Sequence, residues 1–214
     1  MLVVLAAVAV MLALAAPFES SVKPLPAGVR AQLEEVRVWR SGCPVALSSL
    51  RLLTVTHWDF DGKRQTGQLV VNKAVARPLG RVFHKLYRLH FPIRHLSIED
   101  AYGPPQERPT DGDVSGSFEC RPAAPSPCAR GRGTGSWSNH AYGLAVDLNP
   151  RENPYVGCGQ SHDPRAKRYR DRRIHRRGMV TRRVVEAFRS VGWGWGGSWT
   201  GDTKDYMHFS TTGH

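Results

Sequence analysis

Two stretches decide the fold of this chain: Ser138-Asn139-His140-Ala141-Tyr142-Gly143-Leu144-Ala145-Val146-Asp147 and, near its end, Asp205-Tyr206-Met207-His208-Phe209. Together they supply two imidazoles, from His140 and His208, and two carboxylates, from Asp147 and Asp205. Two histidines and one carboxylate that leave a fourth position open form a common catalytic zinc shell. The remaining carboxylate has the chemistry of a base for a metal-activated water. The two stretches therefore predict a Zn²⁺ site of hydrolytic type.

The spacing of these residues predicts how they meet. His140 and Asp147 are seven positions apart, and in a regular strand this odd spacing would place them on opposite faces. Gly143 lies between them and permits a bend or bulge that turns His140 toward the side of Asp147. Asp205 and His208 are three apart, so one tight turn brings both to one site. We therefore expect His140, Asp147 and His208 as metal ligands and Asp205 as the general base.

On these residues the chain resembles the M15 family of bacterial cell-wall peptidases, whose pattern is Ser-x-His-x(6)-Asp followed by Glu/Asp-x-x-His. The sequences at 67–72, 91–93 and 193–197 also resemble those of the family, so the resemblance covers roughly residues 41–212. The family contains D-alanyl-D-alanine carboxypeptidases and dipeptidases and L-alanyl-D-glutamate endopeptidases. The resemblance implies a zinc peptidase of peptidoglycan stem peptides. It also implies an α+β fold of the hedgehog/DD-peptidase type, with a small, mostly antiparallel sheet flanked by helices.

The resemblance suggests two more site residues and leaves the cleaved bond open. Arg121, in Ser117-Phe118-Glu119-Cys120-Arg121, matches a family arginine that stabilises the substrate carbonyl oxygen, although a surface arginine is the alternative. Ser138 is expected to hydrogen-bond the metal site or the peptide, or to be a simple turn serine. Asp205 stands where carboxypeptidase members commonly have Glu, which looks more like the endopeptidase branch. A non-catalytic, zinc-containing wall-binding module is the alternative function, and Asp205 argues against it.

The N-terminus predicts export. Met1 to Ala16 carries no charge and consists almost entirely of Val, Leu and Ala, and Ala13-Leu14-Ala15 suits a signal-peptide cleavage site. The chain would contact a membrane only if this segment stayed uncleaved as an anchor. We expect a linker with a short helix at 17–40 and the catalytic domain at 41–214, in a secreted protein of the cell wall.

Four cysteines in an exported chain predict two disulfides, for which three pairings exist. The family resemblance favours Cys43 with Cys120, which leaves Cys128 with Cys158. A local bond between Cys120 and Cys128 is the alternative.

The formal net charge of +12 indicates an anionic partner. Residues 165–177 hold seven arginines and one lysine. In a cytosolic chain such a run would indicate nucleic-acid binding. Export and the zinc signature instead favour an anionic wall polymer and no nucleic acid. A solvated basic loop without a partner is the alternative.

Periodicity supports an α+β class without a βαβ rhythm. Residues 50–57 and 67–72 predict a hairpin, and Val75 to Tyr87 a helix that Asn72 caps. Strands are expected at 92–99, 143–148 and 207–210, and a helix after the capping Thr181. Long loops are expected at 103–136 and 151–178. His57, Asp59 and Asp61 fit a polar turn better than a metal site. Trp193, Trp195 and Trp199 alternate with glycines, which favours a packed corner over a sugar-stacking surface.

Overall fold

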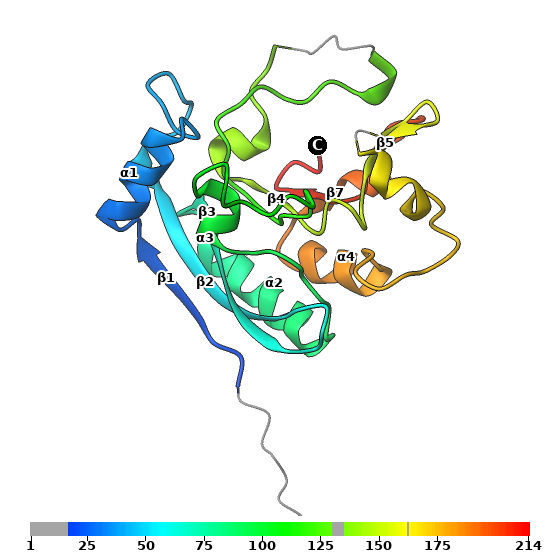
Figure 1. Cartoon of the computed structure of the whole chain (residues 1–214), viewed down its shortest axis with the longest axis horizontal. Helices are drawn as coiled ribbons and strands as arrows, with labels where there is room; N and C mark the ends of the chain where they lie inside the picture. Colours follow the sequence, from blue (N-terminus) through cyan, green and yellow to red (C-terminus); the bar gives the residue numbers. More distant parts are fainter. Residues whose placement is uncertain (1–16, 130–134, 162) are drawn as a thin grey trace, which may run out of the picture.

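A computed structural model describes residues 17–129, 135–161 and 163–214 (Figure 1). The predicted signal segment, residues 1–16, lies outside the described residues. In the described part of the chain, no helix combines the length and the apolar character needed to cross a membrane. The elements are short helices and small antiparallel sheets, which confirms the predicted α+β class.

The first sheet is the predicted hairpin with one further strand. Strands β2 (Leu50–Trp58) and β3 (Arg64–Asn72) pair antiparallel along their full length, and β1 (Ser20–Pro24) pairs with the other edge of β2. In the turn between β2 and β3, the Asp59 carboxylate accepts hydrogen bonds from the backbone of Asp61 and Lys63, both at 2.8 Å. This is the polar turn expected there. Strand β1 lies where a linker was expected, because the exposed edge of β2 offers it backbone partners.

Helix α2 (Ala76–Arg88) covers this sheet, as Figure 1 shows, and confirms the helix expected at 75–87. Its buried face joins β2 and β3 in the main core through Leu79, Val82, Phe83 and Leu86. Pro78 lies in the first turn, where a missing backbone N–H breaks no intrahelical bond. The predicted cap was wrong: Val75 is the N-cap, and the Asn72 carboxamide oxygen instead accepts from Ala74 N at 3.1 Å.

The second sheet carries strands from the two stretches that opened the sequence analysis. Its order is β4 (Ala145–Asp147), β9 (His208–Ser210) and β7 (Gly194–Trp195). Helix α4 (Arg182–Arg189) packs on it, and the ring of Phe188 stacks on Phe209 with centroids 3.8 Å apart. The predicted cap of this helix is confirmed, since the Thr181 hydroxyl accepts from Val184 N at 3.4 Å.

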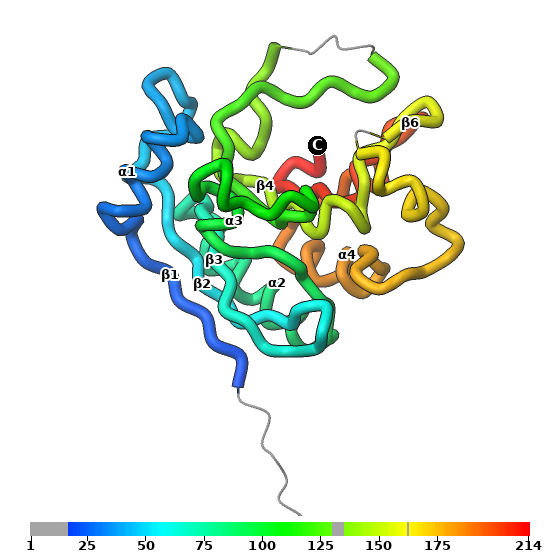
Figure 2. The backbone as a smooth tube through the Cα atoms, in the orientation of Figure 1, coloured from blue at the N-terminus to red at the C-terminus, as the bar shows by residue number. Residues whose placement is uncertain are grey.

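The remaining segments are mostly irregular and surround the end of the second sheet. Figure 2 shows the described residues that precede β4 in the upper part of the view and those that follow β4 on its right side. Short strands β5 (Tyr155–Gly157), β6 (Gln160–Ser161) and β8 (Lys204–Asp205) form a third sheet. The expected strand at 92–99 was wrong. Only isolated bridges occur at Pro92 and His95, and the Ser97 side chain then caps α3 (Ile98–Tyr102).

Two disulfides tie these segments to the rest of the chain. Cys43 bonds Cys120, and Cys128 bonds Cys158, with Cα atoms 5.7 and 5.3 Å apart. The favoured pairing is therefore confirmed. The first bond joins the region after α1 (Ala27–Glu35) to the residue before Arg121, and the second joins the loop before β4 to the turn after β5.

Candidate metal centre

Three predicted ligands converge at the end of the second sheet. Asp147 on β4 lies directly opposite His208 on β9, so their side chains share one face. Asp147 Oδ1 is 3.1 Å from His208 Nδ1, and Asp147 Oδ2 is 3.1 Å from His140 Nε2. The two imidazole nitrogens are 3.2 Å apart. The structure thus brings together the three groups that the sequence assigned to one metal.

His140 reaches this face from a 3-10 helix rather than from a strand. The helix spans Asn139–Tyr142, and the Ser138 hydroxyl caps it by accepting from His140 N at 3.2 Å. Gly143 ends it in the left-handed region at φ +66°. A Cβ at Gly143 would lie 2.7 Å from the backbone nitrogen of Asn72, so only glycine fits both the angle and the space. Gly143 re-aims His140 as predicted, although it ends a helical turn and forms no β-bulge.

Backbone carbonyls fix both imidazole rings. His140 Nδ1 lies 2.5 Å from Ser117 O, and His208 Nε2 lies 3.4 Å from His214 O. A ring nitrogen that donates to a carbonyl leaves the other nitrogen unprotonated and available to a metal. His140 Nε2 and His208 Nδ1 are the atoms left, and they are the ones that face Asp147. Ser117 is a positioning residue that sequence reasoning missed, because a backbone carbonyl leaves no signal in residue type.

The donor atoms fit a zinc ion. In a tetrahedral site with zinc–ligand bonds of about 2.0–2.1 Å, neighbouring donors are about 3.3–3.4 Å apart. The measured separations of 3.1, 3.1 and 3.2 Å are close to this spacing. Among the described residues, His140, Asp147 and His208 are the only group of three such side chains whose donor atoms converge, all lying within 4.8 Å of one another. His57, Asp59 and Asp61 form no such group.

The electrostatics of the two carboxylates differ. Burial opposes ionisation of Asp147, but the adjacent imidazoles of His140 and His208 hold its pKa far below the usual range. Burial and the charge of Asp147 together raise the pKa of Asp205 to about 7, against the opposing effects of His208 and Arg121. Asp205 Oδ1 is buried without a hydrogen-bond partner among the described residues. A nearby divalent cation would favour the ionised form of Asp205, which is the form a base requires.

A cavity of about 340 Å³ opens onto this centre, and every predicted site residue lines it: Arg121, Ser138, His140, Asp147, Asp205 and His208. The Arg121 guanidinium is held by Glu119, whose Oε2 accepts from Nε at 2.7 Å, and by the Pro122 carbonyl at 3.3 Å. About a third of the Arg121 side chain remains exposed, and its charge acts on both His140 and Asp205. Arg121 is therefore placed to meet a polar group of a molecule bound in the cavity.

Aromatic side chains complete the cavity. Trp137, Tyr155 and Trp199 line it, and the Trp199 indole stacks on the His214 ring with centroids 5.8 Å apart. The expected packed corner holds for two of the three tryptophans, since Trp193 is buried and Trp195 stacks on Phe209 at 6.4 Å. Trp199 instead borders the site. The glycine-separated tryptophans indicated that an aromatic residue could border a binding site. The pattern did not distinguish Trp199 from Trp193 and Trp195.

Comparison with known proteins agrees with this geometry. A family model described as D-alanyl-D-alanine carboxypeptidase, of the M15 peptidases, matches residues 132–211. No curated protein and no solved structure matches the chain. The matched segment contains Ser138, the three candidate ligands and Asp205, and it ends just after β9. This match supports the resemblance to the M15 family peptidases that the two motifs predicted.

Proposed function

We propose that this protein is a secreted zinc peptidase that hydrolyses the stem peptides of peptidoglycan, acting as a D-alanyl-D-alanine carboxypeptidase. The observation that carries the proposal is the His140–Asp147–His208 group at the wall of a cavity that Asp205 and Arg121 also line. When bound there, zinc supplies Lewis acidity and an activated water. The description of the matching family model supports the choice of bond.

The residues of the chain divide the remaining work. Asp205 accepts a proton from the attacking water and delivers it to the leaving amine, which avoids expelling a strongly basic anion. Its buried, unpartnered Oδ1 is the atom available for this transfer. Arg121 offers its guanidinium to the carbonyl oxygen, where negative charge develops in the transition state. Ser138 acts through His140, because its hydroxyl fixes the 3-10 turn that carries this ligand.

An endopeptidase that cuts between L-Ala and D-Glu is the second candidate, favoured by one specific observation. His140 and Asp147 border not only the cavity with Arg121 but also a second cavity of about 310 Å³, lined by Asp100, Arg108 and Glu119 among others. Space on both sides of the ligands suits a substrate that continues past the cleaved bond. A carboxypeptidase needs room for only one residue there.

One experiment separates these readings. The zinc-loaded protein is incubated with a defined pentapeptide muropeptide ending in D-Ala-D-Ala, and the products are weighed by mass spectrometry. Loss of a single alanine supports the carboxypeptidase, whereas separation of L-Ala from D-Glu supports the endopeptidase. A protein that holds one zinc per chain and binds the muropeptide, yet yields no product, would be the non-catalytic wall-binding module.

A further inference from the structure

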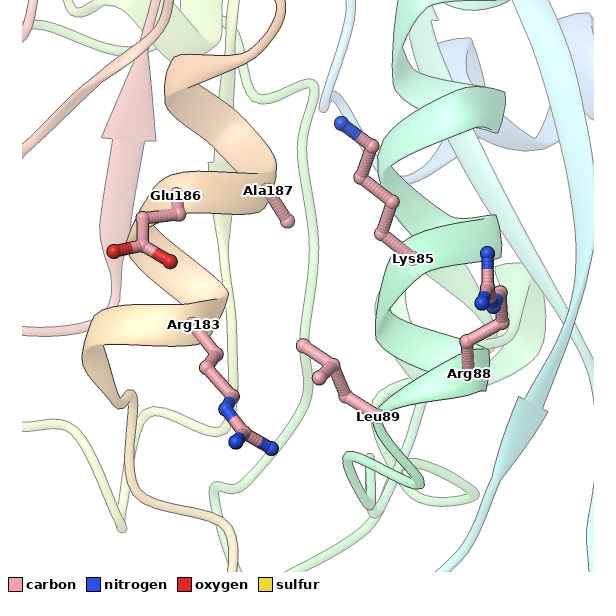
Figure 3. A pocket seen from close by; sticks show the side chains of 6 residues that line it. All are labelled: Lys85, Arg88, Leu89, Arg183, Glu186 and Ala187. Atoms are coloured by element: carbon pink, nitrogen blue, oxygen red, sulfur yellow. The ribbon is translucent and has the colours of Figure 1, made fainter.

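A groove of about 350 Å³ lies between α2 and α4 (Figure 3). Leu89 and Ala187 give it an apolar floor, and the charged side chains around it are Lys85, Arg88, Arg183 and Glu186. Figure 3 shows Lys85 from α2 and Arg183 from α4 both extending toward the space between the helices. The groove shares no lining residue with the cavity at the metal centre. It is a separate surface that the proposed chemistry leaves unused.

The outer face of α2 carries a stripe of positive charge. Arg77, Arg81, Lys85 and Arg88 follow one another at spacings of four, four and three residues, so they lie on one side of the helix. Helix α2 contains no acidic residue. At 1.5 Å per residue, the stripe extends about 17 Å. Like charges at these spacings repel one another and destabilise a helix. Packing of the opposite face of α2 in the core must therefore offset this repulsion.

Helix α4 extends the basic surface across the groove. Arg182, Arg183 and Arg189 are exposed, and Glu186 is the helix's one acid, lying 3.4 Å from Arg182. Within residues 17–129, 135–161 and 163–214, the guanidinium groups of Arg88 and Arg183 make no ion pair and no hydrogen bond. The same holds there for Arg77 and Arg81. These guanidinium groups are therefore available to an external anion.

The basic loop at 165–177, where an anionic partner was expected from the sequence, is arranged differently. Arg165 Nε lies 3.0 Å from Asp163, and Arg173 Nε lies 2.9 Å from Asp171. Arg172 donates to the Glu152 and Val180 carbonyls and lies over the Tyr206 ring at 4.5 Å. Much of the charge in this loop is thus engaged within the chain. In the described part of the chain, α2 and α4 together carry five arginines without an internal partner, whereas in this loop only Lys167 and Arg177 lack one.

We propose that this α2–α4 face binds a linear, phosphate-bearing polymer that holds the peptidase at the cell wall. Several cations in a row without neutralising acids suit repeated negative charges, and the groove suits a chain rather than a plane. A membrane surface is disfavoured, because the exposed large apolar residues in the described part of the chain are Trp137 and Ile174, and neither lies on α2 or α4. Single-stranded nucleic acid is disfavoured, because none of the described residues that line the groove is an aromatic residue on which bases could stack.

The test uses the full zinc-loaded chain and three probes: poly(glycerol phosphate), single-stranded DNA of equal charge, and vesicles containing anionic phospholipid. The variant is R81Q/R88Q/R183Q, and the matched control is K167Q/R173Q/R177Q, which removes three exposed cations from the loop. We expect the groove variant to lose about 10-fold or more in affinity for poly(glycerol phosphate). We also expect the slope of log affinity against log salt to fall by about two. The control should retain its affinity, and both variants should hydrolyse a small peptide substrate at the native rate.

Each other outcome would overturn the proposal in a defined way. Equal loss in both variants would mean that net charge alone drives binding. Loss of polymer affinity in the control variant alone would place the binding site in the loop at 165–177. Tighter binding to DNA or to vesicles than to the polymer would identify a different partner. Because hydrolysis is read separately, an inactive but polymer-binding protein would contradict the proposed function without touching this inference.

Discussion

The metal centre and a second buried charged cluster, formed by Arg94, Asp113 and Glu152, begin from similar ingredients. Each contains two carboxyl groups close together, one of which has a pKa raised to about 7 by burial: Asp205 in the first and Glu152 in the second. Each raised carboxyl has one buried oxygen without a hydrogen-bond donor among the described residues. Perturbed acids of this kind are candidates for function, but structural networks produce them as well.

The difference lies in what neutralises each cluster. Arg94 Nε lies 2.8 Å from Asp113 and Arg94 Nη2 lies 3.3 Å from Glu152, so a resident cation is already in place. The Tyr169 hydroxyl donates to Glu152 at 3.2 Å and closes the cluster further. At the metal centre the partners of Asp147 are two imidazoles, no arginine or lysine of the described residues pairs with Asp147 or Asp205, and the site opens onto a cavity. A buried acid that its own arginine and a tyrosine hydroxyl already occupy has a structural role, whereas one beside an open donor set can perform chemistry.

The largest expected effect comes from removing a ligand. His208→Ala should lose zinc and with it essentially all hydrolysis, because a two-ligand site binds the ion far more weakly. Metal content per chain, measured after dialysis against trace zinc, checks this. The exposed His175→Ala variant serves as the control and should retain one zinc. Full zinc content in His208→Ala would show that the ion is held elsewhere.

The next effect separates the two raised carboxyls directly. Asp205→Asn should keep its zinc but lose about 10²–10⁴-fold in turnover, because the amide cannot accept the proton of the attacking water. Glu152→Gln alters the other buried acid in the same way and should leave turnover near the native value. The muropeptide assay with metal analysis on both variants makes the comparison. A Glu152→Gln enzyme as impaired as Asp205→Asn would remove the distinction drawn between the clusters.

A smaller loss is expected from Arg121, the cation at the open site. Arg121→Ala should lower kcat by about 10²–10³-fold, because the contact to the carbonyl oxygen strengthens as charge develops there. Arg121→Lys should recover only part of this, since an ammonium lacks the planar fork that Glu119 and Pro122 orient. Steady-state kinetics on both variants tests the assignment, with the exposed Arg177→Ala as control. A change confined to KM would instead mean that Arg121 binds a substrate carboxylate.

The contrast between the clusters also explains what the sequence could predict. Asp147 and His208 lie in short motifs whose spacing is governed by local geometry. Their roles as metal ligands could therefore be predicted from the sequence. The β2–β3 hairpin and the Thr181-capped helix could be predicted for the same reason, since each depends on residues that are neighbours along the chain.

The cluster of Arg94, Asp113 and Glu152 could not be predicted from the sequence, because its members come from separate irregular segments with no common motif. Their meeting depends on the path of long loops, which composition does not encode. The third sheet is hidden for a similar reason: β6 and β8 are too short to show an alternating pattern, and their pairing with β5 is long-range. The expected strand at 92–99 failed because a local cap at Ser97 outweighs the β-propensity of the run.

The smallest expected effect is a pH dependence of stability that belongs to the closed cluster. Burial and the neighbouring Asp113 raise the pKa of Glu152 from 4.5 to about 7. The folded state therefore binds a proton more tightly than the unfolded chain. The stability that this proton contributes is complete below about pH 4.5 and is lost as the pH rises to about 7.

Glu152→Gln keeps a neutral donor toward Asp113 at every pH and should match the native protein at pH 5. At pH 8 it should be more stable by about 1 kcal/mol, or about 2–4 °C in Tm. Thermal unfolding at both pH values checks this, with the exposed Glu35→Gln as control. Identical pH slopes in Glu152→Gln and the native protein would mean that Glu152 is ionised in the fold and that Arg94 alone neutralises the cluster.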